Sequence, residues 1–318
     1  MVTRLVSKGH WVRSVDLKMH EYGAEASEFV QGDLTDMNFV REIISAPDGG
    51  FEEIYQFAAD MGGAGYIFSG ENDANVMFNS ATINLNVLKA VLEEKQRNPK
   101  FSPIIFYSSS ACIYPAEIQT NTDSPDLREE YAYPANPDSE YGWEKLFSER
   151  LFLAFNRNHG LDVRIARFHN IFGPQGTWTG GKEKSPAAIC RKVAEVKDGG
   201  TIEVWGDGKQ TRSFLYVNEC LDAVEKLMNS NFMGPVNIGS EEMVSINQLV
   251  EIVAKIAGKT INVIHVDGPT GVRGRNSNND LIRSELHWDY KQTLSEGLET
   301  TYHWIRAQVD SKPGGLDL

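Results

Sequence analysis

The sequence has few cysteines and no long apolar run. A helix that crosses a membrane needs roughly 20 predominantly apolar residues, and no stretch of the chain approaches that length. The opening segment also lacks the apolar core of a secretory signal. Three cysteines, Cys112, Cys190 and Cys220, are odd in number and far apart, which predicts neither a disulfide framework nor a zinc site. We therefore expect no membrane partner, no metal and a reducing, cytoplasmic location.

Basic runs are missing as well. The chain has 31 Lys and Arg residues against 44 Asp and Glu residues, which gives a formal net charge of -13. Because a nucleic-acid surface requires clustered positive charge, this balance argues against DNA or RNA as a partner. An anionic substrate would need a local basic pocket within an acidic protein. With 318 residues, 41% of them hydrophobic, the chain is long enough to bury a sizeable core.

A third absence concerns the start of a dinucleotide-binding fold. Val2, Leu5 and Val6 lie on one face of a predicted helix that ends at Gly9, and a predicted strand then runs to Asp16. An acid at the end of the second strand of such a fold binds the adenosine ribose, about 20 residues after a glycine-rich turn. Only fifteen residues precede Asp16, so we expect the first strand and its glycine-rich turn to be missing from this sequence. Asp16 is a candidate cofactor ligand, with an acid at a surface turn as the alternative.

Strand and helix patterns alternate through the rest of the first half. Predicted strands cover 29–34 and 51–58, and apolar residues at helical spacing cover 76–94. This alternation predicts an α/β protein built on a Rossmann-like, doubly wound parallel sheet. Asp33 and Leu34 are candidates for contact with adenine, although an Asp in this setting commonly caps a helix.

The strand that ends at Ala58 leads into a glycine-rich segment containing Gly62, Gly63 and Gly65. Glycines after a strand permit close approach of the backbone to a phosphate or a ring, and a tight turn explains them equally well. We take Ala58 as a candidate cofactor contact. Gly62 and Gly63 are candidate substrate contacts.

Two further patterns indicate catalysis. An apolar run from 104 gives way to three serines ending at Ser110, as expected for a buried parallel strand whose carboxyl end reaches a ligand site. Tyr141 and Lys145 are four residues apart and therefore lie on the same face of a predicted helix. A nearby cation favours the phenolate, which would lower the pKa of Tyr141 and let it take a proton from a sugar hydroxyl. The spacing by itself also fits a half-exposed helix face.

The second half carries candidate substrate ligands. A predicted strand that closes on a Gly-Pro pair leaves the sheet, and we place a domain boundary there. Residues 1–172 would form a dinucleotide-binding domain. Residues 173–318 would form a smaller α/β substrate domain, with some segments returning to the first domain. His169 on this strand is predicted to be a packed residue satisfied by the backbone. Asn170 beside it is a candidate for holding a sugar hydroxyl.

A glycine-rich loop over 176–187 is expected to lie across the site. Beyond it, Lys192 lies on a predicted helix, and Gln210, Arg212 and Arg275 belong to two polar clusters. Arginines bind diphosphate through paired donors, which fits a nucleotide-sugar pocket. Either cluster alone would more often be a surface ion-pair partner.

Taken together, these segments resemble the extended short-chain dehydrogenase/reductase superfamily, and within it the GDP-mannose 3,5-epimerase family. The motifs that carry the resemblance are Ser109 to Pro115, Tyr141 to Lys145, Arg167 to Pro174, Gly180 to Lys184, Trp205 to Phe214 and Gly271 to Ser277. The resemblance covers nearly the whole chain from about Asp16 onward. Its most specific element is Cys112 after the serines, and the missing glycine-rich turn is its one large departure.

The resemblance implies epimerisation of GDP-mannose at C3 and C5 through a transient 4-keto sugar formed by hydride transfer to bound NAD, with GDP-L-galactose or GDP-L-gulose as products. It assigns the C4 step to Ser110, Tyr141 and Lys145, and the proton exchange to Cys112 and Lys184. A free thiol has a pKa of about 8.5, so Cys112 would need nearby positive charge, which oxidised nicotinamide and the lysines could supply. The resemblance also implies a homodimer paired through a four-helix interface.

The expected contacts can be gathered into two sets. The substrate contacts are Gly62, Gly63, Asn170, Lys184, Lys192, Gln210, Arg212 and Arg275. The cofactor contacts are Asp16, Asp33, Leu34, Ala58, Tyr141 and Lys145. Of these, the resemblance assigns Lys192, Arg212 and Arg275 to the diphosphate.

Two other functions fit parts of the sequence. Another nucleotide-sugar 4-epimerase or dehydratase of the same superfamily would share Ser110, Tyr141 and Lys145 but would not need Cys112 or Lys184. Without the family, Cys112 reads as a small buried apolar residue and Lys184 as a solvated loop charge. A non-catalytic nucleotide-sugar-binding protein is the third possibility, and the intact catalytic set argues against it.

Overall fold

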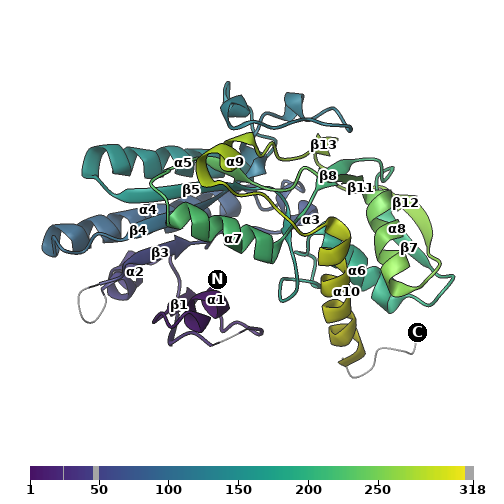
Figure 1. Ribbon diagram of the computed structural model, residues 1–318, viewed down its shortest axis with the longest axis horizontal. Coiled ribbons are helices and arrows are strands. Elements are labelled where there is room, and N and C mark those ends of the chain that lie inside the picture. Colours follow the sequence, from purple (N-terminus) through teal and green to yellow (C-terminus); the bar gives the residue numbers. More distant parts are fainter. Residues whose placement is uncertain (24, 46–49, 312–318) are drawn as a thin grey trace.

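Parallel strands form the centre of the molecule. The computed structural model describes residues 1–23, 25–45 and 50–311, and Figure 1 shows its main sheet among helices. The sheet has the strand order β10-β5-β4-β3, and every neighbouring pair in it is parallel. Its strands are β3 (Glu53–Gln56), β4 (Ile104–Ser110), β5 (Asp162–Phe168) and β10 (Val236–Ile238). The predicted α/β class with a parallel sheet is confirmed.

The first two strands form a separate sheet. β1 (Arg13–Asp16) and β2 (Glu28–Gln31) pair in parallel after the short helix α1 (Val2–Ser7). Within the described residues no strand joins β1 to β3, so the parallel strands fall into two sheets at this point. A ring contact between Trp11 and Phe51, with centroids 6.1 Å apart, links the segments that lead into β1 and β3.

Different helices cover the two faces of the main sheet, because side chains alternate along each strand. Ile105 and Tyr107 of β4 face the core under α2, α4 and α5. Phe106, between them, faces the core under α7 and α9. These helices are α2 (Met37–Ile44), α4 (Asp73–Arg97), α5 (Glu140–His159), α7 (Val217–Met228) and α9 (Asp280–Leu286). Burial of apolar surface, at roughly 25 cal/mol per Å², holds the three layers together.

A second core lies at the other end of the molecule, where α6, α8 and α10 pack around the parallel pair β7 and β12 (Figure 1). The elements of this region are α6 (Ser185–Glu195), β6 (Ile171–Phe172), β7 (Thr201–Trp205), β8 (Thr211–Ser213), β9 (Leu215–Tyr216), β11 (Met243–Ser245), α8 (Ile246–Ala257), β12 (Asn262–Val266), β13 (Gly274–Arg275) and α10 (Leu294–Ser311). From the same half of the chain, β10 and α9 pack with the main sheet. The domain boundary at residue 172 stays a prediction.

Local signals set the ends of the helices that position the site. The Ser139 side chain caps the start of α5, and Gly160, with φ 62°, ends it in the left-handed region that favours glycine. At α2 the cap is Asp36, whose carboxylate accepts a backbone N–H of the first turn. Asp33 instead accepts a hydrogen bond from the backbone of Thr35 and closes a turn. The helix-capping alternative for Asp33 is therefore wrong, because Asp36 caps α2.

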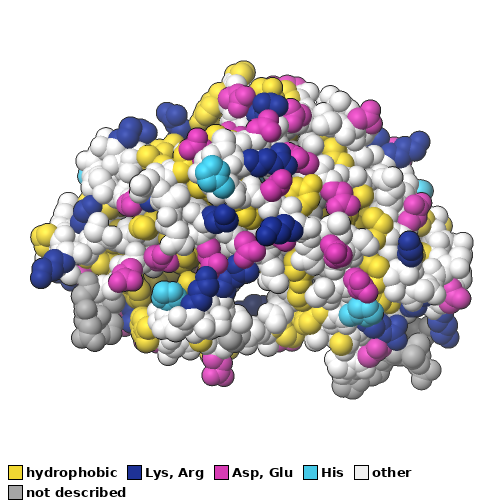
Figure 2. Space-filling view, in the orientation of Figure 1, with side chains coloured by type: hydrophobic (Ala, Val, Ile, Leu, Met, Phe, Trp, Pro, Cys, Tyr) yellow, Lys and Arg dark blue, Asp and Glu magenta, His cyan; other side chains and the backbone are white. Residues whose placement is uncertain are grey.

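The surface is mixed in charge. On the face in Figure 2, Lys and Arg side chains are interspersed with Asp and Glu. No helix in the described part of the chain is both long and apolar enough to cross a membrane. Among the same residues, no group of three or more His, Cys, Asp or Glu side chains is placed to hold a metal ion.

Candidate active site

A cavity of about 510 Å³ lies between the carboxyl ends of β4 and β5 and the second core. In parallel α/β sheets, ligands bind at this end of the strands. The predicted residues that line it are Gly62, Gly63, Ser110, Cys112, Tyr141, Lys145, Asn170, Lys184, Lys192, Gln210, Arg212 and Arg275. The structure therefore gathers every predicted catalytic and substrate residue around one cavity, although they come from distant segments of the chain.

Tyr141 and Lys145 lie on the first turns of α5, as their spacing predicts. The Lys145 ammonium is 5.7 Å from the centre of the Tyr141 ring and 5.0 Å from that of Tyr107, and it donates to the carbonyl oxygen of Ser108 at 2.9 Å. The expected lowering of the phenol pKa is not found. Burial raises the pKa of Tyr141, the nearby Cys112 adds to the rise, and a hydrogen bond with Ser110 only partly offsets it.

Ser110 and Cys112 meet in a short 3-10 turn, Ala111–Ile113, directly after β4. The Ser110 hydroxyl accepts a hydrogen bond from the backbone N–H of Cys112 at 3.2 Å, so it fixes the backbone of the thiol-bearing residue. Gly142 allows α5 to approach this turn, because a Cβ there would collide with the carbonyl oxygen of Cys112. The serine, the thiol and the phenol are thereby held against one another.

Arg275 of β13 places a positive charge against the Cys112 thiol. Its Nη1 donates to the sulfur at 3.1 Å, and its Nη2 forms an ion pair with Asp138. We expected this charge to come from lysines and the cofactor, and we expected Arg275 to bind diphosphate. The positive charge of the lysines and the diphosphate contact of Arg275 both stay predictions. In this structure the Arg275 guanidinium already has protein partners. An Arg and a Cys 163 residues apart leave no sequence pattern that would reveal the contact.

Lys184 immediately precedes α6 and lines the cavity beside Cys112. Lys184 is an exposed residue, yet the protein around its ammonium lowers the pKa of Lys184, while the neighbouring Cys112 acts to raise it. The loop that carries it docks on Gly63, whose backbone N–H donates to the carbonyl oxygen of Lys182 at 3.0 Å. A Cβ at residue 63 would collide with the carbonyl oxygen of Glu183. Gly63 thus has a clear role in seating the Lys184 loop.

Three side chains make one end of the cavity suitable for an anion. Arg212 donates to the carbonyl oxygens of Thr211 and Thr270, at 2.7 and 3.0 Å, and burial lowers its pKa to about 9. Lys192 donates to a backbone carbonyl oxygen at 2.7 Å, and Gln210 leaves its buried Oε1 without a hydrogen-bond partner. An enclosed arginine and a half-buried lysine, both held by neutral carbonyls, together with an unused acceptor fit an anionic ligand with hydroxyl donors.

The predicted adenosine contacts lie outside this cavity, at the carboxyl ends of the first strands. Asp16 ends β1, and Asp33 and Leu34 follow β2, which pairs with β1 in parallel. Ala58 follows β3, and its backbone N–H donates to the Gln56 side chain at 3.1 Å. Strand ends of one orientation suit an extended dinucleotide, but the division between β1 and β3 separates Asp16 from Ala58 by a break in the sheet.

His169 is packed inside the protein, whereas Asn170 beside it lines the cavity. His169 is fully buried, as predicted, but its Nε2 bonds the Asn237 side chain at 2.9 Å rather than the backbone, and its Nδ1 has no partner. Burial lowers its pKa to about 3, so the ring is neutral. Asn170 adopts a positive φ of 48° and donates to the carbonyl oxygen of Ser213 at 2.9 Å. Its amide lines the cavity, where the sugar role stays a prediction.

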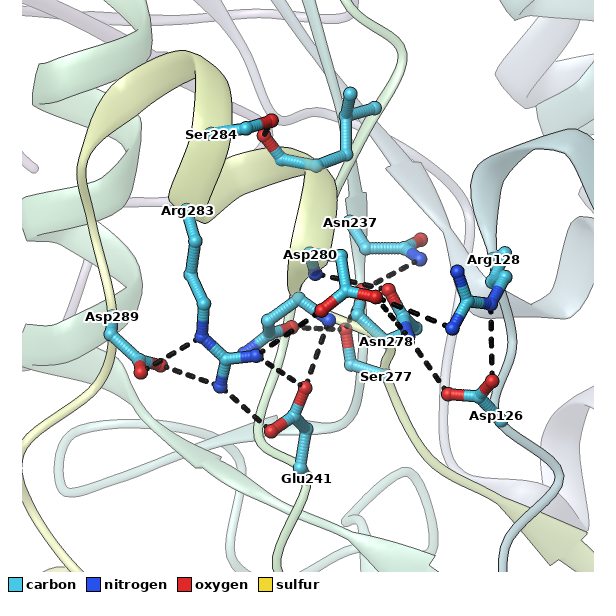
Figure 3. A network of polar contacts seen from close by, with 12 residues as sticks. Asp126, Arg128, Asn237, Glu241, Ser277, Asn278, Asp280, Arg283, Ser284 and Asp289 are labelled. Carbon is cyan, nitrogen blue, oxygen red and sulfur yellow. Dashed lines mark hydrogen bonds and ion pairs between the residues drawn. The ribbon is translucent and has the colours of Figure 1, made fainter.

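Sequence reasoning missed the residues that hold the Arg275 segment. Gln119 and Asp138 contact the guanidinium itself. Further along, Asn278 and Asp280 join Arg128, Asp126, Glu241 and Arg283 in the polar network of Figure 3. The signal in the sequence is a run of polar residues, Arg275 to Asn279. The structure buries all five, and such residues are seldom buried without partners.

Comparisons with known proteins agree with this geometry. Residues 1–239 match the family described as NAD dependent epimerase/dehydratase. The chain is 42% identical to GDP-mannose 3,5-epimerase of Arabidopsis thaliana over 316 residues, which are 99% of this chain and 81% of that protein. It is 41% identical to GDP-mannose 3,5-epimerase 1 of Oryza sativa subsp. japonica, over 99% of this chain and 80% of that protein.

Solved structures support the fold. The crystal structure of Thermus thermophilus UDP-glucose 4-epimerase in complex with NAD matches with a TM-score of 0.80 and 20% identity, over 95% of this chain and 93% of that chain. UDP-glucose 4-epimerase of Thermotoga maritima, solved with UDP-glucose, matches with a TM-score of 0.82 and 21% identity, over 96% of this chain and 94% of that chain. At these identities the likeness establishes the fold alone.

Proposed function

The chain belongs to the NAD dependent epimerase/dehydratase family, and we propose that it epimerises GDP-mannose at C3 and C5 through a transient 4-keto sugar. The products would be GDP-L-galactose, GDP-L-gulose or both. The observation that carries this proposal is that Cys112 and Lys184 line the same cavity as Ser110, Tyr141 and Lys145. A simple 4-epimerase needs only the last three, whereas inversion at the neighbouring carbons needs an additional base and acid.

The anion-binding end of the cavity would hold the nucleotide diphosphate. Among the residues that the structure describes, Arg212 has no carboxylate within hydrogen-bond distance and Lys192 bonds a backbone carbonyl alone, so both retain charge for phosphate oxygens. Gln210 offers its unused Oε1 to a hydroxyl of the sugar or ribose. Arg275 was expected to join them, and any contact it makes to phosphate would compete with its protein partners.

The C4 step belongs to Ser110, Tyr141 and Lys145. The Tyr141 phenolate would take the C4 hydroxyl proton, and the Ser110 hydroxyl would bind the same oxygen. Lys145 keeps N–H donors for ribose hydroxyls, because the hydrogen bond to Ser108 uses only one. Bound NAD would supply the chemistry of accepting the C4 hydride and returning it at the end. Because burial raises the Tyr141 pKa in this structure, the phenolate requires the positive charge of the complete site.

A ketone at C4 makes the protons on C3 and C5 exchangeable, and Cys112 and Lys184 would carry out the exchange. One removes a proton from a face of the sugar, and the other delivers a proton to the opposite face, which inverts the carbon. The opposing charges of a thiolate and an ammonium suit this division of labour. Cys112 acts to raise the pKa of Lys184, which supports the view that both side chains face the same part of the cavity.

The cofactor residues fit NAD at the nicotinamide end. Tyr141 and Lys145 face the cavity beside Ser110, and Lys145 is buried with no ion-pair partner among the described residues. At the adenosine end, Asp16, Asp33, Leu34 and Ala58 would hold the other half of the cofactor. These assignments remain part of the proposal.

A homodimer is also proposed. α4 and α5 lie side by side on one face of the sheet and share the core beneath them (Figure 1). Large apolar side chains project outward from both helices, with Phe78 69%, Leu85 44%, Trp143 40% and Phe147 48% exposed. A second copy pairing its own two helices with these would form a four-helix interface and bury them. Three buried free cysteines fit the proposed cytoplasmic location.

Product identity tests the proposed activity. The protein is incubated with NAD and GDP-mannose, and the sugars are separated and identified by NMR. We expect inversion at C5, with or without inversion at C3. A 4-epimerase would invert C4 alone, a dehydratase would release water and give a 6-deoxy-4-keto sugar, and a binding protein would return GDP-mannose unchanged. Any of these three results would overturn the proposal.

A further inference from the structure

The Arg275 guanidinium is anchored on all three of its nitrogens. Nε donates to Gln119 Oε1 at 2.6 Å, Nη1 to Cys112 Sγ at 3.1 Å, and Nη2 to the Asp138 carboxylate. The Arg275 and Asp138 side chains are only 6% and 4% exposed. Because a guanidinium is planar and its donors point in fixed directions, anchors on Nε and Nη2 determine where Nη1 points.

Gln119 joins this arginine to the thiol-bearing loop. Its side-chain nitrogen donates to the carbonyl oxygens of Tyr114 and Pro115, at 3.0 and 3.2 Å, directly after the turn that holds Cys112. Its backbone carbonyl accepts from Gly274 at 3.0 Å. Gln119 is 1% exposed and neutral. One buried amide thus bonds both the segment carrying the sulfur and the segment carrying the guanidinium, and a shift of either would break its hydrogen bonds.

We propose that Gln119 is a positioning residue that, together with Asp138, holds the Arg275 guanidinium against the Cys112 sulfur so that Arg275 stabilises the thiolate. A cation in direct contact with a sulfur favours the ionised form, and the thiolate is the form that can remove a carbon-bound proton. Gln119 carries no charge, so it influences the thiol only through the placement of its neighbours. The role of Cys112 as a proton-transfer group rests on the proposed function, whereas the ionisation of its thiol can be measured without it.

Other charges also face the thiol. The titratable side chains that interact electrostatically with the thiol are Tyr141 and Lys145 of α5, Lys184 before α6, Arg212 of β8 and Arg275 of β13. Asp138 acts on it through its ion pair with Arg275. Of these, Arg275 is the side chain that donates a hydrogen bond to the sulfur. Loss of its placement should therefore change the thiol more than loss of a distant charge.

Alkylation measures the thiolate directly. The 318-residue protein is treated with iodoacetamide over a pH series, and the rate at Cys112 is followed by mass spectrometry of its peptide. We expect Arg275→Met to raise the midpoint pH of alkylation by about one to two units. Gln119→Met keeps the side-chain length but removes the amide, and we expect it to raise the midpoint by about half a unit or more. Gln119→Asn, which keeps the polarity but is one methylene too short, should act in the same direction and serves if the Met variant does not fold.

Two controls make the test specific. Cys112→Ser should remove the labelled peptide, since Cys112 is 9% exposed and lines the cavity, whereas Cys190 and Cys220 are 0% and 3% exposed and are not among the residues that line it. Arg273→Met removes an arginine from the same segment that pairs with Asp207 at 3.0 Å and does not contact the sulfur, so the midpoint should stay unchanged.

A double variant decides whether Gln119 acts through Arg275. We expect Gln119→Met in the Arg275→Met background to add nothing to the shift, because the group it positions is already gone. Equal midpoints for Gln119→Met and the unsubstituted protein would overturn the inference, as would shifts that add in the double variant. An inactive epimerase with the expected alkylation shifts would instead count against the proposed function alone.

Discussion

The carbonyl oxygen of Glu183 lies against the α-carbon of Gly63 so closely that a side chain at residue 63 would collide with it. This contact seats the loop that brings Lys184 to the cavity. The backbone N–H of Gly63 adds a hydrogen bond to Lys182 at 3.0 Å. Gly63, one of the glycines after β3 that we expected to contact the substrate, therefore holds the loop that carries Lys184.

Substitution of this glycine should separate catalysis from folding. We expect Gly63→Ala to lower kcat/KM by about 10- to 100-fold, because the Lys184 loop must move outward by more than its hydrogen bond allows. The change in the free energy of unfolding should stay within about 2 kcal/mol. Gly176→Ala, where the added Cβ has no heavy atom closer than 3.8 Å, is the matched control and should leave kcat/KM unchanged. Loss of activity in both variants would refute the seating role.

Product formation and GDP binding should respond differently to substitution of Cys112 and Lys184. We expect Cys112→Ser and Lys184→Met each to lower product formation by about 10² to 10⁴-fold, as for loss of one proton-transfer group. Both variants should bind GDP like the unsubstituted protein. Lys182→Met is the matched control, because Lys182 lies on the same loop but sits over the Tyr66 ring at 3.8 Å. Isothermal titration with GDP and product assays check these expectations, and full activity of Lys184→Met would contradict them.

The buried ion pair behind the serine loop should be important for stability. Arg167 and Glu149 pair at 2.8 Å with side chains 4% and 2% exposed, and Ser109 donates to the same carboxylate. Arg167→Met leaves a buried unpaired charge and should cost about 3 to 5 kcal/mol. Urea unfolding of Arg41→Met, whose pair with Glu93 is largely exposed, should show a loss of about 1 kcal/mol or less. If Arg167→Met/Glu149→Leu is no more stable than Arg167→Met, the unpaired charge is not the cause.

Stability should depend on pH through His169. Its pKa is about 3 in the folded protein against 6.5 for the free side chain, so the unfolded chain binds more protons between these values. Stability is therefore lost as pH falls through this window, with a contribution of up to about 1.4 kcal/mol per pH unit. His169→Gln should remove this contribution, whereas His303→Gln at an exposed position should not. Unfolding free energies measured from pH 7 downward test this, and parallel curves for His169→Gln and the unsubstituted protein would contradict it.

Local patterns predicted the parts of the site that lie on regular elements. Tyr141 and Lys145 share a helix face, and Ser110 ends a parallel strand, because helical and strand periodicities are readable from a few residues. The assignment of Cys112 and Lys184 needed the resemblance, since a lone cysteine and a loop lysine carry no periodic signal. The structure places both at the predicted cavity.

Contacts between distant segments were beyond sequence reasoning. The donation from Arg275 to Cys112 spans 163 residues and the bond from Arg275 to Gln119 spans 156, so neither has a spacing that could be recognised. The direction of the Tyr141 pKa shift was also wrong, because proximity of a lysine was visible while the extent of burial was not. His169 was correctly predicted as packed, but its partner Asn237 lies on a strand 68 residues away.

Deuterium incorporated into the sugar shows whether the cavity exchanges the protons on C3 and C5. GDP-mannose is incubated with the protein and NAD in deuterated water, and deuterium at each sugar carbon is read by NMR. The account predicts label at both C3 and C5 and none at C2, with the label lost in Cys112→Ser. A protein that holds NAD and GDP-mannose, yet leaves C3 and C5 unlabelled, would contradict the claim that this cavity exchanges both protons.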